Sequence, residues 1–215
     1  MNRTELVFIL DMSGSMEHLT DDTIGGFNSM LKEQTETVGE VLVTTYLFNN
    51  SSRMVHDRLP IAQVPPMTRA DYRAGGCTAL VDALGEAIYH IVGIHRYART
   101  EDIPAHTIFV VTTDGMENAS HRYNAEQVRE MIRHEQEKYG WEFIFLAANI
   151  DAVETARGYG IDADHAVNYV PDCGGTDIAY ATMSRAIDSI RVDAPLCKNR
   201  AWRESADKDF QKRGK

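Results

Sequence analysis

The fold of this chain is decided by the stretch Leu6-Val7-Phe8-Ile9-Leu10-Asp11-Met12-Ser13-Gly14-Ser15-Met16. Its first five residues are all apolar, which predicts a strand buried on both faces of a sheet. The strand ends in a turn of small residues that carries one carboxylate and two hydroxyls. Because Asp11, Ser13 and Ser15 alternate, a strand end that opens into a loop can point all three oxygens at one spot. The turn is a candidate ion site, although an ordinary strand-to-loop turn with helix-capping residues has the same composition.

Two later stretches strengthen the case for an ion site. Residues 75–80 (GGCTAL) place Thr78 in a glycine-rich loop just before a long helix pattern. Residues 109–115 (FVVTTDG) form another buried strand pattern that ends in Asp114. Carboxylate and hydroxyl oxygens are hard donors, which suit Mg²⁺ or Mn²⁺ better than zinc. Ca²⁺ is less favoured, since a hydroxyl-rich set with few direct carboxylates suits a smaller ion.

The order and spacing of these pieces resemble the metal-ion-dependent adhesion site (MIDAS) of von Willebrand factor type A (VWA) domains. That pattern is Asp-x-Ser-x-Ser, then a distant Thr and a distant Asp, and here Asp11, Ser13, Ser15, Thr78 and Asp114 fill all five positions. The resemblance covers roughly residues 4–192 and is closest to small, single-domain bacterial and phage members. Cys77 departs from the small residue expected beside Thr78.

Strand patterns alternate with helix patterns along the chain, which predicts a parallel sheet with right-handed crossovers and helices on both faces. We expect a Rossmann-like, doubly wound α/β domain of six strands. The resemblance implies the strand order 3-2-1-4-5-6 with strand three antiparallel, and residues 53–59 have the alternating profile of that edge strand. In such a sheet Asp11 and Asp114 end neighbouring strands at the point where strand order reverses.

Helix and strand limits follow from local patterns. Asp21, Asp22 or Thr23 is expected to cap a helix that contains Gly25 and Gly26, two glycines that would allow close packing on the sheet. Asn124 and Gln127 resemble a capping box for a helix that Gly140 closes. Further strands are expected over 141–150 and 166–170, with a short helix over 152–158 between them. The loop 172–176 is expected to lead into the last helix.

The resemblance implies a metal-dependent protein-interaction module rather than an enzyme. Ser13, Ser15 and Thr78 would touch the metal, while Asp11 and Asp114 would act largely through bound waters, so that an Asp or Glu of a partner protein fills an open position. The alternative is a metal-dependent hydrolase or phosphatase that uses the same crevice. Against it, the sequence has neither a Gly-x-Ser-x-Gly elbow nor a phosphate loop with its lysine. Loop residues expected near the rim of the site are Glu17, His18, Glu117, Asn118 and Asp151.

Composition limits the class of protein. At 215 residues the chain fits one well-filled domain. Its net charge of -10 argues against nucleic-acid binding. The three cysteines, Cys77, Cys173 and Cys197, lack metal spacing and are expected to be reduced thiols. Without a signal sequence or a membrane-length apolar run, we expect a cytoplasmic protein that does not bind membranes. The sequence does not decide the oligomeric state.

The C-terminal residues differ in charge from the rest of the chain. We expect a VWA-like domain over residues 1–193 and a basic tail over 194–215. From residue 196 onward the tail has seven basic and three acidic residues, a charge of +4, which leaves -14 on the body. The tail has two large apolar residues, Trp202 and Phe210. It can lie on its own domain, serve a partner, or simply be solvated.

Overall fold

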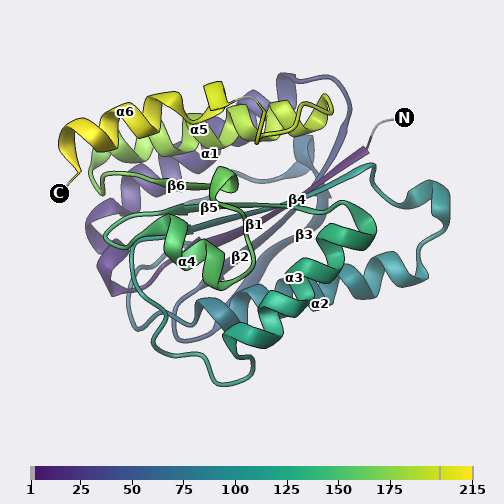
Figure 1. Ribbon diagram of the computed structural model, residues 1–215, viewed down its shortest axis with the longest axis horizontal. Coiled ribbons are helices and arrows are strands. Elements are labelled where there is room, and N and C mark those ends of the chain that lie inside the picture. Colours follow the sequence, from purple (N-terminus) through teal and green to yellow (C-terminus); the bar gives the residue numbers. More distant parts are fainter. Residues whose placement is uncertain (1–2, 199, 215) are drawn as a thin grey trace.

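The computed structural model describes residues 3–198 and 200–214 and has one six-stranded sheet (Figure 1). The strand order is β3-β2-β1-β4-β5-β6, and only the β2–β3 pair is antiparallel. The predicted α/β class, strand order and antiparallel strand are therefore confirmed. The strands are β1 (Arg3–Asp11), β2 (Glu40–Phe48), β3 (Ser52–Pro60), β4 (His106–Thr113), β5 (Glu142–Ala147) and β6 (Ala166–Asn168).

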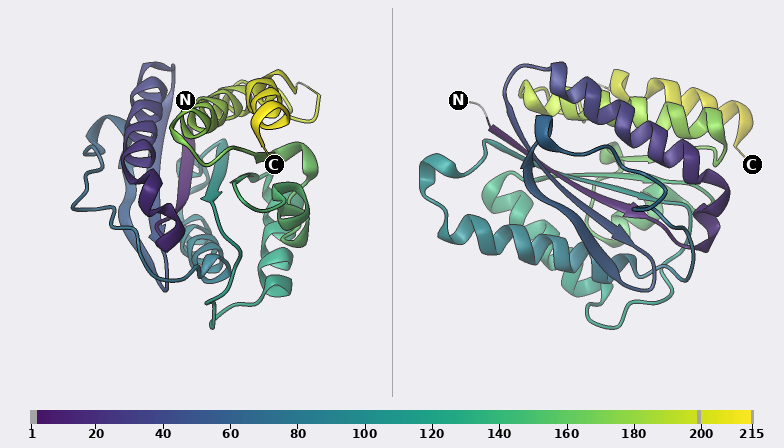
Figure 2. Two further views of the ribbon diagram at one scale, coloured as in Figure 1. Left: turned by 90° about the vertical axis from the view of Figure 1, so that its left-hand side faces the viewer. Right: turned by 180° about the vertical axis from the view of Figure 1, so that it is seen from behind.

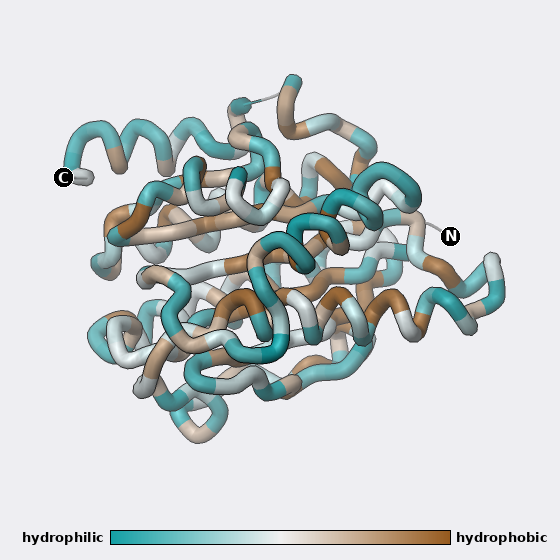
Figure 3. The backbone as a smooth tube through the Cα atoms, turned by 60° about the horizontal axis from the view of Figure 1, so that its bottom comes forward, coloured by the Kyte–Doolittle hydropathy of each residue, from teal (hydrophilic) through white to brown (hydrophobic). Residues whose placement is uncertain are grey.

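Helices cover both faces of the sheet, as the two further views in Figure 2 show. On one face lie α1 (Thr20–Glu36), α5 (Cys173–Arg191) and α6 (Glu204–Arg213); on the other lie α2 (Leu80–Tyr97), α3 (Ala125–Tyr139) and α4 (Ala152–Gly158). Alternate residues of β1 enter the two cores, with Phe8 in the first and Val7 in the second. Figure 3 shows hydrophobic residues gathered on the inner strands, whereas α6 is mostly hydrophilic.

Local signals placed several elements accurately. The capping box at Asn124 and Gln127 is formed, and Gly140 ends α3 in the left-handed conformation with φ of 65°. The short helix α4 has the expected limits. Strands β5 and β6 are shorter than expected and stop at Ala147 and Asn168, where their paired neighbours also end. The predicted loop at 172–176 is instead the first turn of α5, because Asp172 caps it by accepting the Gly175 N–H at 2.8 Å.

The expected cap of α1 was wrong. A 3-10 helix over Gly14–Leu19 leads directly into α1, which begins at Thr20. Neither Asp21, Asp22 nor Thr23 occupies the cap position, which belongs to Leu19 without any side-chain bond. A preceding helical turn already supplies carbonyl acceptors to the first N–H groups, so no side-chain cap is needed.

The two glycines of α1 differ in what surrounds them. A methyl group at Gly26 would lie 2.3 Å from the buried Tyr180 ring of α5, whereas one at Gly25 would meet nothing within 4 Å. Gly26 therefore allows helix α1 to approach helix α5, and the expected packing of both glycines on the sheet was wrong.

This difference gives a testable pair of variants. Gly26→Ala should destabilise the protein by about 1–3 kcal/mol through overpacking against Tyr180. Gly25→Ala, one residue away in the same helix, should instead raise the free energy of unfolding by up to about 1 kcal/mol. Urea unfolding of the two variants measures both, and equal effects of the same sign would contradict this account.

The described tail residues lie on the domain, the first of the three arrangements that the sequence left open. Leu196, Trp202 and Ala206 are buried in the core shared with α5. Helix α6 was not predicted, because only a few of its residues are apolar. The domain boundary at residue 193 stays a prediction.

Among the described residues, no helix is both long enough and apolar enough to cross a membrane.

Candidate metal centre

Two loops at the carboxyl end of β1 and β2 form the backbone frame of the site. The Met12 N–H bonds the Phe48 carbonyl at 2.7 Å, which continues the β1–β2 pairing past Asp11. Beyond it, Gly14 donates to the Gly76 carbonyl at 3.0 Å and Gly75 donates to the Met12 carbonyl at 2.9 Å. These bonds fasten the loop after β1 to the glycine-rich loop before α2, so the two motifs are held side by side.

Asp11 is fully buried and organises the loop with both carboxylate oxygens. Its Oδ1 accepts the Ser13 N–H at 2.7 Å, and its Oδ2 accepts the Thr113 hydroxyl at 2.6 Å. Its main-chain carbonyl accepts the hydroxyl of the buried Tyr72. Burial raises the pKa of Asp11 to about 6, against the lowering effect of the bonds from Thr113 and Ser13. A metal ion nearby would favour the charged carboxylate and oppose the effect of burial.

The two serines and Asp114 form one chain of oxygens. The Ser15 hydroxyl donates to Asp114 Oδ1 at 2.5 Å, and the hydroxyl oxygens of Ser13 and Ser15 are 3.1 Å apart. Asp114 Oδ2 is buried and has no hydrogen-bond partner in the described chain. Burial also raises the pKa of Asp114. An unpaired buried carboxylate oxygen is costly, and in a native site it calls for an ion or water.

Thr78 completes the group at the start of α2. Its backbone is clamped by Asn118, which accepts the Thr78 N–H on Oδ1 at 2.9 Å and donates its own N–H to the Thr78 carbonyl at 3.0 Å. A methyl group placed on Gly115 would lie 3.5 Å from the Thr78 hydroxyl and 3.6 Å from the Ser15 hydroxyl. The hydroxyls of Thr78 and Ser15 therefore flank the same point.

The structure thus brings all five predicted site residues together, and only Ser15 is exposed. The donor set fits a hard divalent cation, because it combines three hydroxyls with two carboxylates, one of them with an unpaired buried oxygen. Within the described residues no three His, Cys, Asp or Glu side chains are grouped to hold a metal. A site here consequently depends on its serine and threonine hydroxyls.

The residues expected at the rim have different roles. Asn118 clamps Thr78, as described above. Both carboxylate oxygens of Glu117 already accept backbone hydrogen bonds: one from the N–H of Val81 in α2 at 2.8 Å, and one from the N–H of Ala119 in its own loop at 2.9 Å. Asp151 caps α4. Glu17 and His18 are exposed on the loop after β1, and the His18 ring contacts the carbonyl oxygens of Ser15 and Pro171.

Two supporting residues were missed by sequence reasoning. Thr113 precedes Asp114 in the predicted strand end, so its hydroxyl was a signal that could have been used. Tyr72 lies in the irregular segment between β3 and α2, and no local pattern indicated that it reaches Asp11.

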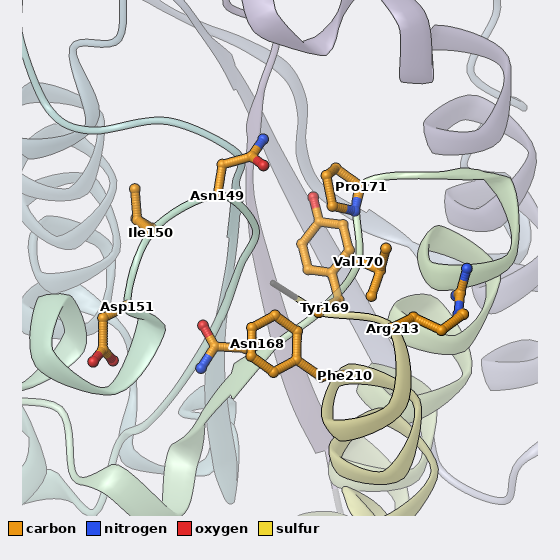
Figure 4. Close-up of a pocket in the computed structure, with 10 residues that line it drawn as sticks. Asn149, Ile150, Asp151, Asn168, Tyr169, Val170, Pro171, Phe210 and Arg213 are labelled. Atoms are coloured by element: carbon orange, nitrogen blue, oxygen red, sulfur yellow. The ribbon is translucent and has the colours of Figure 1, made fainter.

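A pocket of about 610 Å³ lies beyond the carboxyl ends of β5 and β6 (Figure 4), and the carbonyl oxygen of Pro171, which lines it, is 3.3 Å from the His18 ring of the loop after β1. Asn149, Asn168 and Tyr169 line it from the sheet, and Phe210 and Arg213 line it from α6. Burial, and then the charges of neighbouring groups that include Asp114 and Asp11, hold the Tyr169 pKa well above its usual value.

Comparison with known proteins identifies the fold through structure alone. No protein-family model matches the sequence, and no curated protein matches it. A mutant PilB minor pilin from Streptococcus sanguinis superimposes with a TM-score of 0.64 at 11% identity, over 91% of this chain and 64% of that one. A von Willebrand factor type A structure from Catenulispora acidiphila gives 0.55 at 16% identity, over 85% of this chain and 42% of that one.

A third similar structure is proximal thread matrix protein 1 from the mussel byssus, described with a zinc-occupied MIDAS motif. It gives a TM-score of 0.55 at 12% identity, over 91% of this chain and 46% of that one. This chain spans less than two thirds of each of the three structures. The fold is that of a VWA domain, and a structure of this fold holds a divalent metal at its MIDAS motif.

Proposed function

We propose that this chain is a divalent-metal-dependent protein-interaction module whose metal is held by Asp11, Ser13, Ser15, Thr78 and Asp114. The observation that supports it best is the buried, unpaired Asp114 Oδ2 beside converging hydroxyls. The VWA fold and the zinc-occupied motif of a similar structure support a metal at this position. We expect Mg²⁺ or Mn²⁺ in this chain, because all the donors are hard oxygens.

We expect the five residues to have two different roles at the metal. Ser13, Ser15 and Thr78 would offer neutral oxygens directly, while Asp11 and Asp114 would hold these hydroxyls and the metal's waters in place. The bound ion would supply a positive charge with an open coordination position for a carboxylate. Asp11 is suited to a supporting role, because Ser13 and Thr113 already bond both of its oxygens.

The proposed partner is a protein with an Asp or Glu at the centre of a basic surface. Residues 1–195 have a net charge of -14, which would repel an acidic surface at long range. The metal site would contact the central acid, and the adjoining pocket would receive the residues beside it. Phe210 offers an apolar wall there, and the exposed Asn149 offers an amide.

A metal-dependent hydrolase is the second candidate, and the geometry favours it less. A hydrolase that used Ser13 would need a general base within hydrogen-bond reach of its hydroxyl. His18 lies on the same loop, yet its two ring nitrogens are 2.8 and 3.3 Å from main-chain carbonyl oxygens. We therefore propose that the chain is not an enzyme. Turnover of generic phosphatase or esterase substrates that disappears in Ser13→Ala would overturn this.

We further propose that the chain works in the cytoplasm and belongs with the small single-domain members of the fold. Cys77, Cys173 and Cys197 are free and exposed, as expected in a reducing compartment.

The test of the module is partner binding with and without metal. Proteins captured from native lysate in Mg²⁺ should be released by chelator, and Ser15→Ala and Thr78→Ala should each remove most of the affinity. Ser29→Ala, an exposed serine on α1, is the matched control and should bind normally. Added salt should slow association and leave the metal requirement intact. Full binding in chelator would exclude the proposal.

A further inference from the structure

A second pocket, of about 630 Å³, lies at the opposite end of the sheet from the metal centre. It is formed by the end of α2, the segment before β4, and the end of α3. Thr107, at the start of β4, lines it, whereas Asp114 follows the end of the same strand. Seven residues of strand separate the two positions by roughly 23 Å. The pocket is therefore separate from the metal centre; the ends of α2 and α3, whose residues line it, lie on the right in Figure 1.

Glu135 is the unusual residue of this pocket. Its side chain is 7% exposed, and no hydrogen bond to its carboxylate is formed by the described residues. The His134 ring, at 3.9 Å, is its one ion-pair neighbour there. Burial raises the Glu135 pKa despite the lowering effect of nearby His134, His95 and Lys138. A carboxylate with so little exposed area and no hydrogen-bond donor from the described residues is open to a donor from a ligand.

The other buried carboxylate of this region is fully paired. The Glu5 side chain has no exposed area. Its carboxylate contacts His95 Nε2 at 2.7 Å and Arg58 Nε at 2.6 Å. Since His95 Nε2 is committed to Glu5, it does not serve Glu135. Glu135 is left facing a cavity that a donor from outside the chain can enter.

A positive charge stands beside Glu135 without pairing to it. Lys138 is three residues further along α3, the spacing at which Glu and Lys ordinarily meet on one helix face. Its ammonium lies instead 5.1 Å from the centre of the Tyr139 ring. Arg96 of α2 also lines the pocket, and neither Arg96 nor Lys138 forms an ion pair with a carboxylate in the described chain. One pocket thus presents a carboxylate whose one ion-pair neighbour in the described chain is His134, at 3.9 Å, and two cations that form no ion pair there.

The remaining wall is apolar. Trp141 is 4% exposed and stacks on Phe109 with the ring centres 5.3 Å apart. Val92, Ile103 and Pro104 line the same cavity. Separated opposite charges beside an apolar wall match a small molecule that carries both charges and an apolar group.

We propose that this pocket binds a small zwitterion, a free amino acid with an apolar side chain. Its ammonium pairs with Glu135, its carboxylate meets Lys138 and Arg96, and its side chain packs on Trp141. The pairing supplies the buried carboxylate with charge-assisted hydrogen bonds that the chain itself lacks. The site is independent of the metal centre and of the partner-binding function proposed above.

The test is calorimetric titration of the full chain with L-phenylalanine and L-leucine, and then with the other standard amino acids. Phenethylamine and 3-phenylpropionate each keep one of the two charges of phenylalanine and should bind roughly tenfold or more weakly, since each loses a charge-assisted bond. Glu135→Gln should weaken amino-acid binding roughly ten- to hundredfold. Glu137→Gln, an exposed neighbour on α3, is the matched control and should bind normally.

Removal of a buried unpaired charge is not expected to unfold the Glu135→Gln variant, and its melting temperature should equal or exceed that of the wild type. Chelator should leave amino-acid binding unchanged, which separates this site from the metal centre. The proposal would be overturned if no standard amino acid bound saturably, if phenethylamine bound as well as phenylalanine, or if Glu135→Gln bound like the wild type.

Discussion

Asp114→Asn is expected to abolish the thermal stabilisation that a divalent metal gives the wild-type protein. A metal that binds only the folded state at one hundred times its dissociation constant stabilises it by about 2.7 kcal/mol. For a domain of this size that corresponds to a melting temperature roughly 5–10 °C higher. The variant loses the charge and the buried, unpaired Oδ2 that the metal centre would use. It keeps an oxygen that can accept the Ser15 hydroxyl bond.

The experiment compares melting curves in chelator and in millimolar Mg²⁺, Mn²⁺, Ca²⁺ and Zn²⁺. In chelator, Asp114→Asn should melt at or above the wild-type temperature, because a buried charge without a full set of partners has been removed. Asp177→Asn, an exposed carboxylate on α5, is the control and should keep the full metal response. If none of the four ions shifts the wild-type curve, the chain does not hold a metal at these residues.

The sequence predicted the fold because its strong signals are local and repeated. Runs such as Leu6–Leu10 and Phe109–Val111 are apolar at every position, which is the signature of strands covered on both faces. Once β1 and β4 are recognised as neighbours in a doubly wound sheet, their carboxyl ends must meet. The closeness of Asp11 and Asp114 was predictable for this reason, although they are 103 positions apart in the sequence.

The supporting contacts were not predictable in the same way. Tyr72 belongs to an irregular segment, and its bond to the Asp11 carbonyl depends on how that segment folds back over the strand. Glu135 reads in the sequence as one more charged residue on an amphipathic helix. The structure instead leaves its side chain 7% exposed in a pocket that Trp141 also lines, and the Trp141 backbone N–H bonds the Glu135 carbonyl at 3.2 Å. Such contacts depend on tertiary packing, which residue periodicity does not encode.

The position of the tail was not predictable from the sequence either. Its charge and low hydrophobicity are compatible with a solvated segment, whereas the structure buries one of its large side chains. Trp202 is 2% exposed and is buried in the core shared with α5, together with Leu196 and Ala206. Arg203 adds two bonds to Asp207, at 2.8 and 3.0 Å, that stiffen the first turn of α6.

Trp202→Ala is accordingly expected to lower the free energy of unfolding by about 3–5 kcal/mol, the usual cost of emptying a buried aromatic site. Trp202→Phe should lose much less, since it keeps a ring and removes an indole N–H that is buried without a partner in the described chain. Lys212→Ala, exposed on α6, is the control and should be neutral within about 0.5 kcal/mol. Urea unfolding measures all three.

A large loss of unfolding free energy in Trp202→Ala alone would place the tail within the folding unit. If residues 194–215 did not share the core of the domain, a substitution in them could not destabilise that core. A neutral Trp202→Ala would show instead that residues 194–215 are an appendage.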